Sequence, residues 1–287
     1  MISDITLGQF FPGSSMLHRL DPRSKILIAA MYIVAVFLAN NLAGFAILLL
    51  STLFLIFVSR ISIVVILKSL KPLIFVLIFT SVINVFLTGG EGEALINIGI
   101  FHIYKEGILK AVFMAVRVVL LIIGSSVLLT YTTSPISLTD GIESVLAPLK
   151  HIKVPVHLFA MMMTIALRFI PTLIEETEKI MNAQKSRGAD FSSGNLVRRA
   201  KALIPILVPL FVSSFKRAEE LATAMECRCY RGDKNRTKLV KLSYKPLDFA
   251  WLSLSAILIG LVILFRFRPQ ITELSPTVLK IIFYGVI

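Results

Sequence analysis

Two arginines, Arg187 and Arg228, are the residues of this sequence best suited to hold a partner, because each ends a long helical pattern. They stand in two short motifs, Ser186-Arg187-Gly188 and Cys227-Arg228-Cys229. An arginine in the last turn of a helix complements the negative helix end, and its planar fork can pair a carboxylate through two hydrogen bonds. The predicted chemistry is therefore recognition of a partner by charge.

The two motifs repeat each other over a longer stretch. When the two arginines are aligned, Glu178 matches Glu219 and Ala183 matches Ala224. The arginines are 41 residues apart, which leaves room for one turn and one returning helix. One arginine followed by a turn is ordinary helix capping. Two arginines with the same neighbouring residues favour two similar binding ends. Such a pair suits a partner with two similar binding sites, such as a dimer.

No catalytic or metal-binding set accompanies these arginines in the sequence. The histidines form no HxxxH or HExxH pattern, and the two cysteines lack the further nearby ligands that zinc needs. There is also no GxxxxGK[ST] run, so we expect no P-loop ATP hydrolysis by this chain. We predict no catalytic residue, no metal site and no directly bound cofactor.

The composition places the arginines in a membrane protein. The 287 residues are 56% hydrophobic and 16% charged, whereas a soluble chain is about half apolar and about a quarter charged. This excludes a soluble enzyme and a disordered chain. The formal net charge of +13 does not indicate nucleic-acid binding, because the basic residues lie between apolar segments. They suit cytoplasmic loops and anionic lipid headgroups instead.

Apolar segments predict an all-α integral membrane protein with about five transmembrane helices and long cytoplasm-facing helices. The expected spans are residues 26–39, 42–58, 73–87, 107–131 and 247–265. The predicted organisation is an N-terminal membrane domain of four spans (1–131), a cytoplasmic or interfacial helical module (132–245), and a C-terminal span with a tail (246–287). Basic residues cluster before the first span and between the second and third, so the N-terminus is expected in the cytoplasm.

The two long helical patterns of the module are each about 30 residues, or about 45 Å. Their N-terminal halves are apolar all round and their C-terminal halves are amphipathic, so each can begin at membrane depth and end in water. Pro171 in the first pattern, and Pro205 and Pro209 in the second, are expected to bend them.

Three stretches resemble a known family. Residues 17–25, LHRLDPRSK, resemble the N-terminal signature of the CbiQ-like transmembrane (T) component of energy-coupling factor (ECF) transporters. The two arginine motifs resemble its paired Ala-Arg-Gly motifs. The second, in residues 224–232, is close to the form of T components that are shared among many substrate-binding subunits. Ser186 and Cys227 stand where the family has alanine, and Cys229 stands where it has glycine. These residues are small, so the arginine motifs are still expected to fit their binding sites on the partner.

The resemblance implies a non-catalytic subunit of an ATP-driven importer in a prokaryotic cell membrane. Arg187 and Arg228 would dock into two ABC-type ATPases, a homodimer or heterodimer, which use ATP and Mg. The long cytoplasm-facing helices of residues 132–245 would be coupling helices, which pass motion to a small membrane-embedded substrate-binding (S) component for vitamin or micronutrient uptake. Apolar helix faces, including Met161, Met162 and Met163, would seat that component.

Four further residues are structural or coupling candidates. Asp21 before Pro22 is typical of a helix N-cap with proline in the first turn. Arg117 lies inside an expected span, where pairing with a carboxylate or a helix end is favoured over a direct role in transport. Arg168 is interpreted similarly, as a tie between coupling helices, and Arg231 follows the second motif closely.

Two other classes of protein remain as alternatives. A stand-alone permease would need polar residues at a midplane cavity or broken helices, and the spans offer little besides Arg117. A lipid-modifying membrane enzyme would need a carboxylate or histidine constellation at the membrane surface, and no such motif occurs in the sequence.

Overall fold

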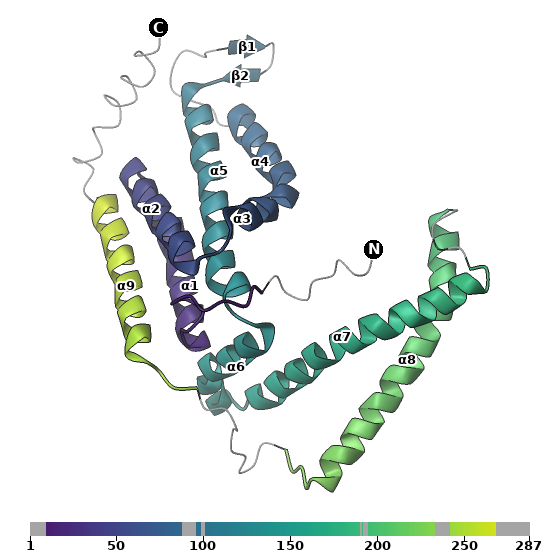
Figure 1. Cartoon of the computed structure of the whole chain (residues 1–287). Helices are drawn as coiled ribbons and strands as arrows, with labels where there is room; N and C mark the ends of the chain where they lie inside the picture. The colour runs from purple at the N-terminus through teal and green to yellow at the C-terminus, as the bar shows by residue number, and fades with distance from the viewer. Residues whose placement is uncertain are drawn as a thin grey trace. The chain divides into compact units, whose positions relative to one another are not determined.

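The structure is a computed structural model that describes residues 10–87, 96–98, 101–189, 191, 195–232 and 242–267. It divides into two compact units (Figure 1). The coupling unit contains the described part of Pro135–Lys241. The membrane unit contains the described parts of Gln9–Ser134 and Leu242–Ile287. The chain thus leaves the membrane unit once and returns to it for its last described helix.

The membrane unit is helical apart from one short antiparallel hairpin. Its elements are α1 (Pro22–Leu38), α2 (Leu42–Ser59), α3 (Ile63–Leu70), the 3-10 turn η1 (Lys71–Leu73), α4 (Ile74–Leu87), β1 (Ile96–Ile98), β2 (Phe101–Ile103), α5 (Lys105–Ser125), the π-helical η2 (Ser126–Tyr131) and α9 (Pro246–Phe267). In the hairpin, Ile96 pairs with Ile103.

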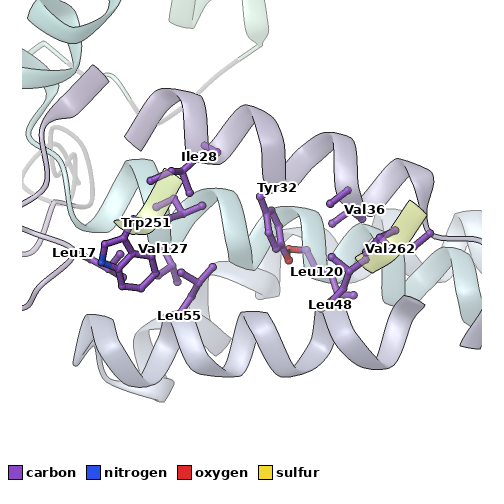
Figure 2. Packing of buried hydrophobic residues seen from close by; sticks show 14 of the residues in the cluster. Leu17, Ile28, Tyr32, Val36, Leu48, Leu55, Leu120, Val127, Trp251 and Val262 are labelled. Atoms are coloured by element: carbon purple, nitrogen blue, oxygen red, sulfur yellow. Dashed lines mark hydrogen bonds between the residues drawn. The ribbon is translucent and has the colours of Figure 1, made fainter. Parts of the chain in front are cut away.

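The core of this unit lies where α1, α2, α5 and α9 meet (Figure 2). Tyr32 points from α1 into it and its hydroxyl contacts both neighbours, Thr52 Oγ1 of α2 at 2.7 Å and the Leu120 carbonyl of α5 at 3.1 Å. The ring needs the space beside Gly124 of α5, where an added Cβ would overlap it. A glycine therefore lets α5 approach α1 closely.

Five of the described helical segments are long and apolar enough to cross a membrane: Leu42–Ser59, Ile63–Phe86, Gly107–Tyr131, Val156–Ser186 and Pro246–Phe267. This confirms the predicted all-α membrane fold. The set does not contain α1, which was expected to span: it has 17 residues, one fewer than α2, the shortest helix of the set. The 31-residue helix Val156–Ser186, which was not among the expected spans, is long and apolar enough to cross a membrane.

The expected span at 73–87 is also longer than the sequence indicated. Helices α3 and α4 form one apolar helical run, Ile63–Phe86, with η1 between them. Pro72 lies in η1 and lacks a backbone N–H, so the regular hydrogen-bond pattern is interrupted while the chain stays helical.

The coupling unit consists of α6 (Pro135–Val145), the 3-10 segment η3 (Ala147–Ile152), α7 (Val156–Ser186) and α8 (Leu196–Cys227). Figure 1 shows α7 and α8 crossing as two long rods. At the start of α7, His157 Nδ1 lies 2.9 Å from Glu143 Oε1 of α6 and joins the two helices. Many apolar side chains of α7 and α8 are exposed within this unit.

We predict that Gly124→Ala destabilises the membrane unit by about 1–3 kcal/mol, because the added methyl group forces the Tyr32 ring out of its place. Thermal unfolding in detergent measures this. Gly260→Ala is the matched control, since no atom lies within 4 Å of the added Cβ. Equal unfolding midpoints for the two variants would contradict the packing argument.

Candidate partner-docking site

Helix α7 ends in a tight hydrogen-bonded turn that presents Arg187. Ser186 is the last helical residue, and Arg187 follows as the C-cap. Gly188 adopts a left-handed conformation with φ +86°. Its N–H donates to the Lys185 carbonyl at 2.9 Å, and the next amide, of Ala189, donates to the Gln184 carbonyl at 3.0 Å. This pair of bonds defines a Schellman motif, which satisfies the last carbonyls of the helix.

Helix α8 ends in the same motif and presents Arg228 in the same position. Cys229 is left-handed with φ +59°, and its N–H donates to the Glu226 carbonyl at 2.8 Å. The amide of Tyr230 donates to the Met225 carbonyl at 3.0 Å. The repeat seen in the sequence is thus a repeat of backbone geometry. The difference is that Cys229 holds a conformation that glycine adopts without steric cost.

The two helix ends are open to solvent within the coupling unit. The exposed residues are Ser186, Arg187, Gly188, Cys227, Arg228, Cys229 and Arg231. Within the described part of the chain, neither Arg187 nor Arg228 forms an ion pair. Both guanidinium groups are therefore available to a carboxylate on another protein.

An ion pair joins α7 and α8 at the same number of residues from each docking arginine. Arg217 Nη2 of α8 lies 2.7 Å from Glu176 Oε2 of α7, and the two residues are 41 positions apart, the same separation as the two arginines. Each docking arginine therefore lies eleven residues beyond this pair on its own helix, or about 16 Å. The sequence analysis missed this pair, although the 41-residue repeat contained the signal.

Arg168 does not make the tie between α7 and α8 that we expected of it. It is exposed and has no ion pair or hydrogen bond among the described residues, so the Arg217–Glu176 pair takes that role. Next to that pair, toward the start of α7 and the end of α8, an apolar pocket of about 270 Å³ lies between the helices. Phe169, Leu173 and Leu221 are among the residues that line it.

Asp21 lies in a buried corner of the membrane unit. Its side chain accepts a hydrogen bond from the Arg23 amide at 2.9 Å and caps α1. Its own N–H donates to Asp248 Oδ1 at 2.8 Å, and the Lys245 amide donates to Asp248 Oδ2 at 2.7 Å. Asp248 is fully buried and was missed by the sequence analysis. An acidic residue two positions after Pro246, in the first turn of a helix, was the available signal.

The lysine of the N-terminal signature completes this corner. Lys25 is 2% exposed, and its Nζ donates to the Thr132 carbonyl at 2.7 Å and to Thr133 Oγ1 at 3.1 Å. Arg23 lies over the ring of Tyr244, 5.5 Å from its centroid. The signature therefore fixes the start of α1 against the segment that follows η2 and the segment that precedes α9.

Arg117 of α5 contacts the end of α1. Its Nη2 donates to the Ala39 carbonyl at 2.7 Å and to Asn40 Oδ1 at 3.3 Å, and its guanidinium lies 5.4 Å from the Phe45 ring centroid. The charge thus meets the negative end of a helix and an aromatic face.

Among the described residues, no group of three or more metal-binding side chains occurs.

A family model described as a cobalt transport protein, CbiQ, matches residues 13–239 of the chain. The chain belongs to the CbiQ family. It is 53% identical to a Clostridium kluyveri relative over 93% of this chain and 98% of the relative. A Ruminiclostridium cellulolyticum relative is 51% identical over 93% and 99%, and a Bacillus subtilis relative 46% identical over 92% and 97%. Each is named energy-coupling factor transporter transmembrane protein EcfT.

This membership confirms the resemblance found in the sequence. The CbiQ-family chain is a transmembrane component of ECF transporters, and it is a multi-pass protein of the bacterial cell membrane.

We predict that Asp248→Asn lowers the thermal unfolding midpoint in detergent by several degrees. An amide has only one acceptor oxygen, so either the Asp21 or the Lys245 N–H loses its partner, at a cost of about 1–3 kcal/mol. Asp140→Asn is the control, since Asp140 accepts no hydrogen bond among the described residues. An unchanged midpoint in Asp248→Asn would refute the role of this carboxylate.

We predict opposite effects of two substitutions at the helix ends. Gly188→Ala introduces a left-handed alanine, costs about 1 kcal/mol and speeds hydrogen exchange of the Ala189 amide several-fold. Cys229→Gly removes the same strain and slows exchange of the Tyr230 amide. Exchange measured by mass spectrometry on the full chain tests both. Effects of the same sign at the two ends would show that the conformations differ in solution.

Proposed function

We propose that this T component docks two ATPases through Arg187 and Arg228, one at each helix end. The observation that supports this is the repeat of one Schellman motif at both ends, with an exposed, unpaired arginine at the same position of each. A dimeric ATPase offers two similar binding sites, which suit two similar helix ends. The neighbouring Ser186, Gly188, Cys227 and Cys229 are small residues, which allow a partner to approach closely.

ATP and Mg are then used by the ATPases, and this chain contributes no catalytic residue. Each arginine ends one of two helices, α7 and α8, which are joined by the Arg217–Glu176 ion pair. Movement of one ATPase relative to the other would therefore exert force on both helices. This gives a physical route from nucleotide-driven motion to the coupling unit. Arg231, exposed just beyond the second motif, adds positive charge to that tip.

The exposed apolar faces of α7 and α8 are proposed to seat the S component. Phe159, Met162 and Met163 on α7 and Phe211 and Phe215 on α8 are all more than half exposed within the chain. Apolar surface of this extent suits a membrane-embedded partner, and methionines adapt to more than one shape. Specificity for a vitamin or another micronutrient would reside in that partner.

The proposed orientation places the N-terminus and both arginine tips in the cytoplasm. It rests on the distribution of basic residues, because Arg19, Arg23 and Lys25 precede the core of α1, and Arg60 and Lys68 lie between α2 and α4. ATP is available on that side of the membrane, which agrees with docking of ATPases there.

We predict that the double variant Arg187→Glu and Arg228→Glu inserts in the membrane but no longer retains the ATPases. Each single reversal should weaken ATPase binding at least tenfold, because breaking a desolvated charge pair costs about 2–5 kcal/mol. Co-purification in mild detergent and uptake by whole cells measure the two effects. Lys201→Glu, at an exposed position near the start of α8, is the control.

The proposal is wrong if ATPases and uptake persist in the double variant while the control behaves like the wild type. Uptake by the purified chain alone, in vesicles without ATPases, would instead support the stand-alone permease.

A further inference from the structure

An apolar groove of about 340 Å³ runs along the membrane unit between α1, α2 and α9. Phe54, Leu254 and Leu258 line it together with Trp251 and Ile28. Phe54 and Trp251 are stacked, with ring centroids 6.0 Å apart. Trp251 and Ile28 also belong to the core cluster, and Figure 2 shows them at one end of it.

The polar groups that border the groove are already satisfied by the protein. Tyr32, Ser51 and Ser255 each donate their hydroxyl to a backbone carbonyl, at 3.1, 2.8 and 2.8 Å. The groove therefore offers no unpaired hydroxyl to a ligand, and an occupant gains stability there by burying apolar surface.

The groove is about two thirds as long as one lipid leaflet is deep. From Trp251 to Leu258 it follows seven residues of α9, or about 10 Å, and half of the hydrocarbon core is about 15 Å. Its lining residues Phe54 and Trp251 each lie five residues from the end of the unit where α2 finishes at Ser59 and α9 begins at Pro246. Because α2 and α9 are membrane-crossing helices, the solvent around the groove is lipid.

Positive charge gathers at this same end. Arg60 directly follows α2 and Lys245 directly precedes α9; both are exposed and lack an ion pair among the described residues. Among the described residues of the membrane unit, the carboxylates at this end are Asp21 and Asp248, which are buried and accept backbone N–H donors. They leave Arg60 and Lys245 available to an external anion.

We propose that the groove binds one acyl chain of an anionic phospholipid, and that Arg60 and Lys245 hold its headgroup phosphate. The chain lies on the Trp251–Phe54 stack, and the headgroup sits at the ends of α2 and α9. In the proposed orientation this is the cytoplasmic leaflet, where anionic lipids attract juxtamembrane lysine and arginine. The site is independent of ATPase docking, since none of its residues belongs to the coupling unit.

Trp251 provides a direct test, because it is the only tryptophan of the sequence and lines the groove. The full chain is reconstituted in phosphatidylcholine vesicles that contain a few per cent of either brominated phosphatidylglycerol or brominated phosphatidylcholine. Bromine quenches tryptophan fluorescence at short range. We expect phosphatidylglycerol to quench Trp251 at several-fold lower mole fraction than phosphatidylcholine does.

The charge variants show whether the site causes this preference. Arg60→Gln and Lys245→Gln should each reduce the preference about fivefold at most, and together abolish it. Lys110→Gln is the control. It removes an exposed cation near the start of α5, at the opposite end of that helix from η2, so the preference for phosphatidylglycerol should stay unchanged. Ser51→Leu fills the groove and should weaken quenching by both lipids.

Equal quenching by the two brominated lipids would overturn the proposal. So would a preference that persists when both Arg60 and Lys245 are replaced, because it would then arise from the general positive charge of the chain. These experiments need no ATPase, so their failure is distinguishable from failure of the docking proposal.

Discussion

The buried carboxylate of Asp248 is the constraint on which the membrane unit depends. A fully buried charge must be satisfied by hydrogen bonds or opposite charge, and Asp248 receives the amides of Asp21 and Lys245 on its two oxygens. The start of α1 and the start of α9 are thereby joined, although they are more than 200 residues apart in the chain. Each of these two amides is bonded to a different oxygen of the carboxylate, so both segments are held by the same side chain.

The same corner anchors both segments through which the chain enters and leaves the coupling unit. The outgoing segment is bonded to Lys25 at Thr132 and Thr133, and the returning segment to Asp248 at Lys245. The N-terminal signature therefore acts as a fixed point for both connections.

The two helix ends show how local chemistry can prepare a partner site. Each Schellman motif satisfies the terminal carbonyls internally, so the arginine side chain is not needed as a cap and remains available. The Arg217–Glu176 pair adds a common reference point from which both tips are equally distant along their helices. Cys229 shows that the geometry is held even where the residue type opposes it.

The sequence by itself determined the helices, the membrane character, the family and the two arginine ends. These depend on hydropathy, helical period and capping residues, which act between positions a few residues apart. Only the tertiary structure decided which distant groups meet: Asp21 with Asp248 across 227 positions, Arg117 with Ala39 across 78, and Glu176 with Arg217 across 41. Such partners include backbone carbonyls and amides that every residue carries, so residue type alone does not single them out, and packing of the helices selects them.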